Sequence, residues 1–223
     1  GGELLWVDGA DFRRLGHLAP LPLPGGDRAA REPWRMACAV LHALGSPDEA
    51  ARRFAHQPKV AQVLDMLARG TRCPPATSLG RCFDAAAALL GLCETMSFEG
   101  QAAMRLETAA RAYGKALPLP GAYHIDRRAP DGPSVLNLYP LFKLLAEEGD
   151  PARGAAHFHA SLVDGLVHWL AEAAHASGLR RVVLAGGCLH NRVLAAGLRH
   201  KLGARGLAVF EAQHEPPGDG GIA

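Results

Sequence analysis

The amino-acid sequence predicts a helix-rich α/β fold, and two features carry this prediction. A short apolar run rich in β-branched residues, Val182 to Leu184, reads as a buried strand; Gly186-Gly187 and apolar residues at helical spacing over 189–198 follow it. A second short strand is expected over 207–210, so this unit suits a parallel pair with a right-handed crossover. Upstream, most of the chain places apolar residues at the spacing typical of helices.

The segments before this unit are expected in the following order. Residues 3–14 form two short strands around a turn at Asp8-Gly9. Prolines and glycines exclude regular structure from 21–28, which is either a linker or a fixed loop whose glycines approach a ligand or another backbone. The stretch 117–133 is a loop or a hairpin containing 122–125, and 135–138 is a short strand. Helices are expected over 33–44, 59–68, 79–90, 97–113 and 141–148, and from Pro151 or Ala155 to Ser177. A further helix is expected from Pro47, with Ser46 and Glu49 as its capping box. Phe98 and Tyr113 are expected among the buried residues of the helix over 97–113.

Composition limits the class of protein. The chain has 223 residues, 48% hydrophobic and 21% charged, with a net charge of +2, which gives no electrostatic reason to expect nucleic acid or a membrane as partner. No apolar run approaches the length of a membrane span. The odd number of cysteines, without C-x-x-C spacing, favours reduced thiols in a cytoplasmic protein: Cys38, Cys73, Cys82, Cys93 and Cys188. Because the chain starts without Met and stops on Gly-Ile-Ala, we expect it to be a piece of a longer protein.

The glycine turn is the first candidate for a binding site. Strand, glycine turn and helix form the layout that binds phosphate, because glycine admits close approach and a helix N-terminus offers unpaired N–H groups. The same pattern also serves merely to pack a helix on a strand. Asp219, flanked by glycines after the second strand, is either a metal or phosphate ligand or a turn residue. Two carboxylates near helix starts, Asp84 and Glu99, read as solvated groups that favour the helix dipole.

Two further groups at candidate positions are interpreted as structural. His157 and His159 stand two apart on the long helix and so face different ways, which favours surface or capping roles over metal binding. Cys188 follows the glycines and reads as a structural residue at a helix start. The residues show no Ser/His/Asp or Cys/His set for nucleophilic catalysis.

Five segments together resemble one known family. They are LPLPGGDRAAREPWR (21–35), SLGRCFDA (78–85), SFEGQAAM (97–104), AGGCLHNR (185–192) and GDGGIA (218–223). In this order they resemble the HypF carbamoyltransferases, which mature nickel–iron hydrogenases. The likeness runs essentially end to end and concerns the carbamoyl-transferring domain, which is similar to the TsaD enzymes of tRNA threonylcarbamoyladenosine synthesis. It implies an actin-like ATPase fold, of the ASKHA and TsaD-like type, incomplete at its N-terminal side.

The resemblance also implies a reaction. Carbamoyl phosphate and ATP would form carbamoyl-adenylate in a separate domain, and the present domain would transfer the carbamoyl group to the C-terminal cysteine of a HypE-type acceptor protein. By motif, Asp84 and Glu99-Gly100 would lie at the nucleoside, Gly186-Gly187 at phosphate, and Asn191 at sugar or base. Asp219 would be a ligand of a divalent metal.

One departure from the family pattern matters. The other metal ligands of the family come from an H-x-x-x-H segment upstream of the GGE with which this chain begins. We therefore expect residues 1–223 to form the C-terminal portion of the TsaD-like domain, to bind metal poorly and to be inactive alone. Within it, 1–150 is expected as a nucleoside-binding part and 151–223 as a phosphate and metal part. The alternatives are a small-molecule O-carbamoyltransferase of the same fold and a non-catalytic nucleotide-binding or docking module.

Overall fold

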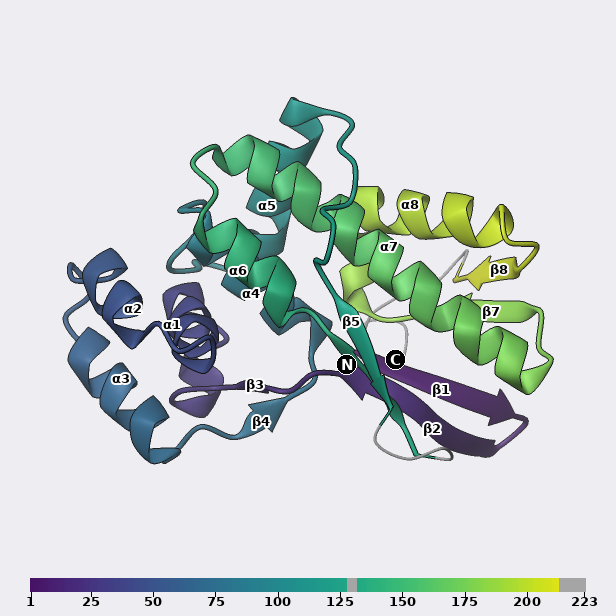
Figure 1. The fold of residues 1–223 in the computed structure, drawn as a ribbon, viewed down its shortest axis with the longest axis horizontal. Coiled ribbons are helices and arrows are strands. Elements are labelled where there is room, and N and C mark those ends of the chain that lie inside the picture. The colour runs from purple at the N-terminus through teal and green to yellow at the C-terminus, as the bar shows by residue number, and fades with distance from the viewer. Residues whose placement is uncertain (128–131, 213–223) are drawn as a thin grey trace.

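The computed structural model describes residues 1–127 and 132–212, and it confirms the expected helix-rich α/β architecture (Figure 1). The strands are β1 (Glu3–Asp8), β2 (Asp11–Leu18), β3 (Leu21–Pro22), β4 (Pro75–Ala76), β5 (His124–Arg127), β6 (Ser134–Asn137), β7 (Arg181–Leu184) and β8 (Ala208–Glu211). The α-helices are α1 (Pro33–Ala43), α2 (Pro47–Arg53), α3 (Val60–Arg69), α4 (Leu79–Leu89), α5 (Gln101–Tyr113), α6 (Tyr139–Ala146), α7 (Pro151–Ser177) and α8 (Arg192–Gly203). Two short 3-10 helices are η1 (Gly26–Arg28) and η2 (Gly187–His190).

The strands form three sheets. The largest has the order β1-β2-β6-β5, in which β2 and β6 are parallel and the other pairs antiparallel. The expected strand pair of the glycine unit is confirmed, since β7 and β8 are parallel and place Val183 opposite Phe210. Alternation along these two strands buries Val182 and Leu184 in the hydrophobic core and leaves Val183 and Phe210 exposed on the opposite face.

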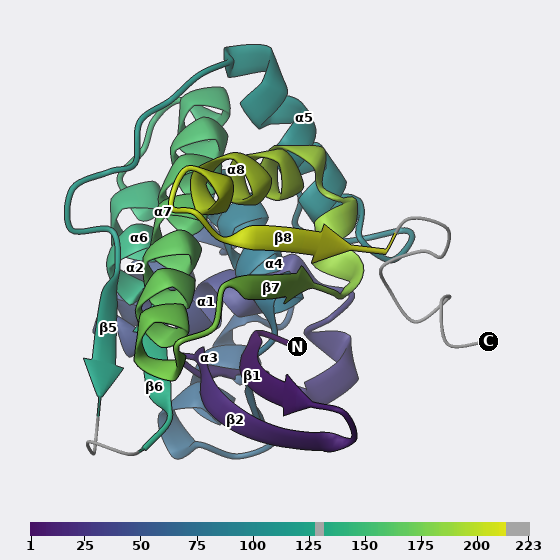
Figure 2. The same ribbon diagram turned by 90° about the vertical axis from the view of Figure 1, so that its right-hand side faces the viewer.

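The 27-residue helix α7 runs through the centre of the molecule and contacts α5, α8 and β6 (Figures 1 and 2). Asp150 begins it, because its carboxylate accepts from the backbone N–H groups of Ala152 and Arg153, and Gly178 in the left-handed region ends it. Close contact with α8 depends on Gly197, where a Cβ would lie 2.9 Å from the Val163 side chain. One hydrophobic core runs through residues of both parts expected within the chain, and the division at residue 150 stays a prediction.

Three local expectations were wrong. Ser46 makes no side-chain capping bond, and Glu49 pairs with Arg52 and Arg53 one turn later in α2. The α5 helix begins at Gln101, so Phe98 stays outside it, 54% exposed; Tyr113, its last residue, is also half-exposed.

The third concerns the stretch 21–28. It was expected to lack regular structure, yet its first two residues, in β3, pair with β4, and Leu23 N donates to Pro74 O. Hydrogen bonds thus satisfy backbone polar groups of this segment despite its prolines. Of the two alternatives, the segment is therefore a fixed loop and not a linker.

The contact between β2, β6 and α7 yields a prediction about folding. A Cβ on Gly16 would lie 2.5 Å from Ser134 O and 2.5 Å from Cζ2 of Trp169. We expect Gly16→Ala to lower the free energy of unfolding by about 1–3 kcal/mol, because backbone and a buried indole must move. Gly149→Ala is the control, since no atom lies within 4 Å of its Cβ position and its φ is ordinary. Equal denaturant midpoints for the two variants would contradict this account.

Candidate phosphate and nucleoside site

The glycine turn follows β7 directly. Gly186 has φ 111° and ψ 154°, a conformation that L side chains rarely adopt, and it leads into the η2 turn. No atom lies within 4 Å of a Cβ built on Gly186 or Gly187, so open space adjoins both residues. Both are exposed to solvent, and this backbone can therefore meet a ligand without displacing a side chain.

Two backbone N–H groups at the N-terminus of α8 already have hydrogen-bond partners. Asn191 Oδ1 accepts from Leu194 N at 2.9 Å, and Glu107 Oε1 on α5 accepts from Arg192 N at 3.1 Å. This differs from the expectation of unpaired N–H groups, since two of the donors in the first turn already bond to side-chain oxygens. An anion at this site would therefore meet the backbone of Gly186, Gly187 and Cys188 unless Glu107 moved away.

Asn191 is buried, and its amide has a second partner. Its Nδ2 lies 2.9 Å from Nε2 of His159, and His159 Nδ1 lies 2.8 Å from Ala155 O. His159 is 1% exposed, which corrects its interpretation as a surface or capping residue. His157, by contrast, is only half-buried and bonds to Leu117 O. The assignment of Asn191 to a nucleotide stays a prediction.

The N-terminal half of α4 approaches the same turn. A Cβ on Gly80 would lie 4.0 Å from Sγ of Cys188, and burial together with the charge of Asp84 raises the pKa of the Cys188 thiol. Figure 2 shows the segment that joins β7 to α8 beside α4 and α5. The structure thus brings Asp84 into the region of Gly186-Gly187 and Asn191, although it precedes them by more than 100 residues in sequence.

Asp84 is a buried carboxylate, not a solvated one. It is 3% exposed, and its Oδ2 lies 2.8 Å from Nη1 of Arg81 as an ion pair. Neither atom has a hydrogen-bond partner among the described residues, although both are buried. Burial raises the pKa of Asp84 to about 7, while Arg81 acts in the opposite direction. The ion pair with Arg81 leaves the carboxylate with further lone pairs, and such lone pairs can accept hydrogen bonds from ligand hydroxyl groups.

Glu99 and Gly100 lie at the start of α5. Gly100 is the N-cap with φ 80°, and Glu99 is exposed, without a hydrogen bond or ion pair to another described residue. Gly100 precedes Glu107 by seven residues, and it is Glu107 whose carboxylate accepts from Arg192 N at the start of α8. The nucleoside role of Glu99 and Gly100 stays a prediction.

The LPLPGGDRAAREPWR segment contributes a buried cation that the sequence did not reveal. Arg35 is 3% exposed, pairs with Glu32, donates to Pro24 O at 3.4 Å and stacks 4.9 Å from the centre of the Trp34 ring. Charge and stacking together hold the loop against the start of α1. Apolar periodicity indicates which apolar side chains of a helix are buried, and it gives no sign that a charged residue in the first turn of α1 is buried as well.

Two backbone bonds then connect this loop with the segment before α5. Trp34 N donates to Glu94 O, and Met96 N donates to Arg31 O. The first motif segment thus lies against residues 94–96, which directly precede the SFEGQAAM segment.

The predicted metal ligand Asp219 lies outside the described residues. Over 1–127 and 132–212, no three His, Cys, Asp or Glu side chains gather closely enough to hold a metal ion. The described residues alone do not fit a metal, and the assignment of Asp219 stays a prediction. In the same part of the chain, no helix is both long and apolar enough to cross a bilayer.

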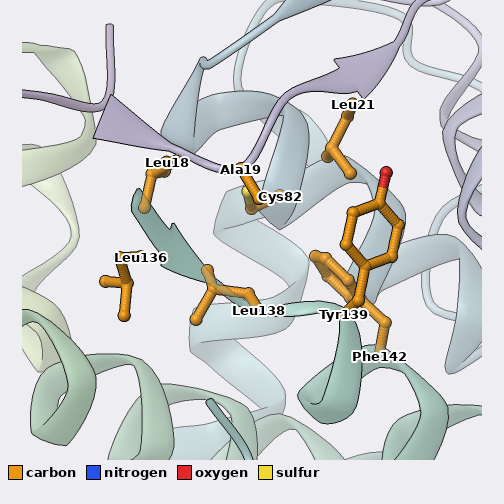
Figure 3. Close-up of a pocket in the computed structure, with 8 residues that line it drawn as sticks. All are labelled: Leu18, Ala19, Leu21, Cys82, Leu136, Leu138, Tyr139 and Phe142. Carbon is orange, nitrogen blue, oxygen red and sulfur yellow. The ribbon is translucent and has the colours of Figure 1, made fainter. Parts of the chain in front are cut away.

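An apolar crevice lies elsewhere, between the β2–β3 connection and α6 (Figure 3). Its walls are aliphatic and aromatic apart from the Cys82 thiol and the Tyr139 hydroxyl: Leu18, Ala19, Leu21, Cys82, Leu136, Leu138, Tyr139 and Phe142. The hydroxyl already donates to Pro20 O, and burial raises the pKa of Cys82. This crevice lacks the converging polar groups of a ligand site, so the glycine turn remains the candidate.

Comparison with known proteins identifies the family. A family model described as "Carbamoyltransferase, Kae1-like Domain, second subdomain" matches residues 1–223. The chain belongs to the HypF carbamoyltransferase family. HypF2 of Cupriavidus necator is 48% identical over 100% of the chain and 30% of its own length, and HypF of Rhizobium leguminosarum bv. viciae is 45% identical over 100% and 28%. The crystal structure of full-length HypF in its phosphate- and nucleotide-bound form matches with a TM-score of 0.85 at 28% identity, covering 99% of this chain and 29% of that one.

These matches confirm the expected family and its TsaD-like fold. The chain spans 30% of the HypF2 relative and 28% of the Rhizobium HypF.

Sequence reasoning also missed two residues that contact the start of α8, His159 and Glu107. His159 had a signal, because it falls three and seven residues before Leu162 and Leu166, on the buried stripe of α7. Glu107 had none, since its contact with α8 depends on how two distant helices pack.

Asp84 gives a pH-dependent prediction. A carboxyl group whose pKa rises from 3.8 to about 7 on folding binds more protons in the folded state, so its contribution to stability is lost as pH rises from about 4 to about 7. We expect the free energy of unfolding of the wild type, relative to Asp84→Asn, to fall by about 2–4 kcal/mol over this range. Urea titrations at several pH values measure it. Other titrating groups cancel in the difference, and a difference that does not vary with pH would contradict the buried, weakly paired state of Asp84.

Proposed function

We propose that this chain forms the part of a HypF carbamoyltransferase that binds ATP or carbamoyl-adenylate, with carbamoyl transfer to the C-terminal cysteine of a HypE-type protein as its reaction. The observation that carries the proposal is the convergence of the open Gly186-Gly187 backbone with the buried carboxylate of Asp84, which is ion-paired with Arg81. Backbone N–H groups suit a phosphate, and a carboxylate accepts hydrogen bonds from ribose hydroxyls. The phosphate- and nucleotide-bound HypF structure supports this choice of ligand.

The proposed transfer is an acyl substitution. The acceptor thiolate attacks the carbamoyl carbon, a C–S bond forms, the C–O bond to the adenylate phosphate breaks, and AMP leaves with the electron pair. Cys188 stands closest to the turn, but burial and the charge of Asp84 raise the pKa of its thiol and so disfavour the thiolate. We assign no catalytic nucleophile, because the nucleophile of this reaction belongs to the acceptor. A divalent metal, with Asp219 as a proposed ligand, would supply charge neutralisation at the phosphate when bound.

The motif set favours hydrogenase maturation over the alternatives. The likeness to HypF sequences covers the whole chain at 45–48% identity in two relatives. A small-molecule O-carbamoyltransferase of the same fold would not explain that extent of likeness. A docking module would bind nucleotide without passing on the carbamoyl group, and the acceptor reaction in the full-length protein would distinguish it.

The nucleoside contacts can be tested by substitution. Asp84→Ala and Asn191→Ala should each weaken ATP binding by about 1–3 kcal/mol, the cost of losing a buried polar partner. Isothermal titration calorimetry with ATP measures both. Asp65→Ala is the matched control, because Asp65 is exposed on α3 and pairs with the neighbouring exposed Arg69. Unchanged affinity in both site variants would remove the assigned site.

The phosphate contact has its own test. Gly187 has ordinary φ and free space at its Cβ position, so Gly187→Ala should leave the melting temperature nearly unchanged. The added methyl group would occupy the space next to the backbone that a phosphate requires, and we expect at least about tenfold weaker ATP binding, or roughly 1.4 kcal/mol. Gly203→Ala, at the last residue of α8 and with equally open space at its Cβ position, is the control. A Gly187→Ala protein that binds ATP as tightly as the wild type would place the phosphate elsewhere.

A further inference from the structure

A fully buried histidine lies beneath the glycine turn, in surroundings that would otherwise suit an apolar side chain. The ring of His159 has its centre 5.6 Å from the ring centres of both Phe83 and Phe158. Burying an imidazole there costs free energy unless its nitrogens are hydrogen-bonded, and both nitrogens are. Packing against two phenylalanine rings does not account for a histidine at position 159, so its two hydrogen bonds require an explanation.

The partners determine the protonation of the ring. Ala155 O can only accept, so Nδ1 of His159 carries the hydrogen. Leu194 N can only donate, so the Asn191 side-chain atom facing it is Oδ1, and the amide nitrogen must face His159. That nitrogen donates, and Nε2 is therefore the unprotonated acceptor. Each bond in the series from α7 to α8 is consistent with one tautomer and one amide orientation.

We propose that His159 is a positioning residue that holds the Asn191 amide and, through it, the start of α8 and the end of the glycine turn. This inference rests on the proposed function for its consequence in nucleotide binding. With its orientation set, Asn191 keeps one amide hydrogen and one oxygen lone pair for a ligand. Burial lowers the pKa of His159, which keeps the ring neutral and the acceptor available near neutral pH.

The first test reads the ring directly. In ¹⁵N-labelled wild-type protein at neutral pH, two-bond nitrogen–proton correlations should show His159 as the Nδ1–H tautomer, opposite to the form that predominates in free histidine in water. Asn191→Ala should shift the Nε2 resonance, because the hydrogen bond to that nitrogen is lost. A ring protonated on Nε2 would overturn the proposal, and this result does not depend on nucleotide or on any variant at position 159.

The second test separates positioning from packing. His159→Phe keeps an aromatic ring and removes both nitrogens, whereas His159→Gln places an amide oxygen near the position of Nε2. We expect the Phe variant to exchange the Leu194 amide hydrogen at least about fivefold faster and to bind ATP at least about fivefold more weakly, as for one lost hydrogen bond. The Gln variant should recover most of both. His157→Phe, on the same helix but outside this series of bonds, should match the wild type.

The outcomes are distinct. An unchanged Leu194 exchange rate in His159→Phe, or unchanged ATP affinity in that variant, overturns the proposal. If the wild type itself binds no ATP, the proposed function fails, while the ring tautomer and the Leu194 exchange rate still decide whether His159 positions Asn191. If the Phe variant does not fold, the wild-type tautomer and the Gln variant decide it.

Discussion

The packing of α7 is the constraint on which the rest of the structure depends. Toward its C-terminal end, the buried face of α7 packs on the sheet, where Trp169 Nε1 donates to Ser134 Oγ at 2.7 Å beside Gly16. The other end carries His159, which bonds to Asn191 at the start of α8. A single helix therefore fixes where the sheet lies and where the glycine turn points. Small residues permit this, because Gly197 lets α8 approach the Val163 side chain.

The candidate site follows from that arrangement. Side-chain oxygens of Asn191 and Glu107 already occupy two donors of the first turn of α8, so the exposed Gly186-Gly187 backbone is what remains for an anion. On the facing helix, Asp84 is buried in low-dielectric surroundings and is ion-paired with Arg81. Such a carboxyl group costs stability unless a partner arrives, and sites that store this kind of cost are typical of function.

Local patterns predicted a good part of this. The strand, glycine turn, helix and strand of residues 181–211 could be read because period and turn chemistry are local properties. Burial of individual polar residues could not be read so well. Asp84 looked solvated because the sequence does not show that α1, α5 and α7 surround α4, and His159 was judged by its neighbour His157 rather than by its stripe. The grouping of distant motifs came from the family likeness, since helix packing over 100 residues leaves no periodic trace.

The most direct measurement of the central claim is a map of backbone amide shifts during a titration of the ¹⁵N-labelled chain with ATP. The account predicts that the largest shifts fall on residues 186–188 and on the N-terminal half of α4, with smaller ones at the start of α8. Shifts concentrated around the apolar crevice at Tyr139 and Phe142, or on α2 and α3, would contradict it. Such a result would show that the glycine turn serves only to pack α8 against β7.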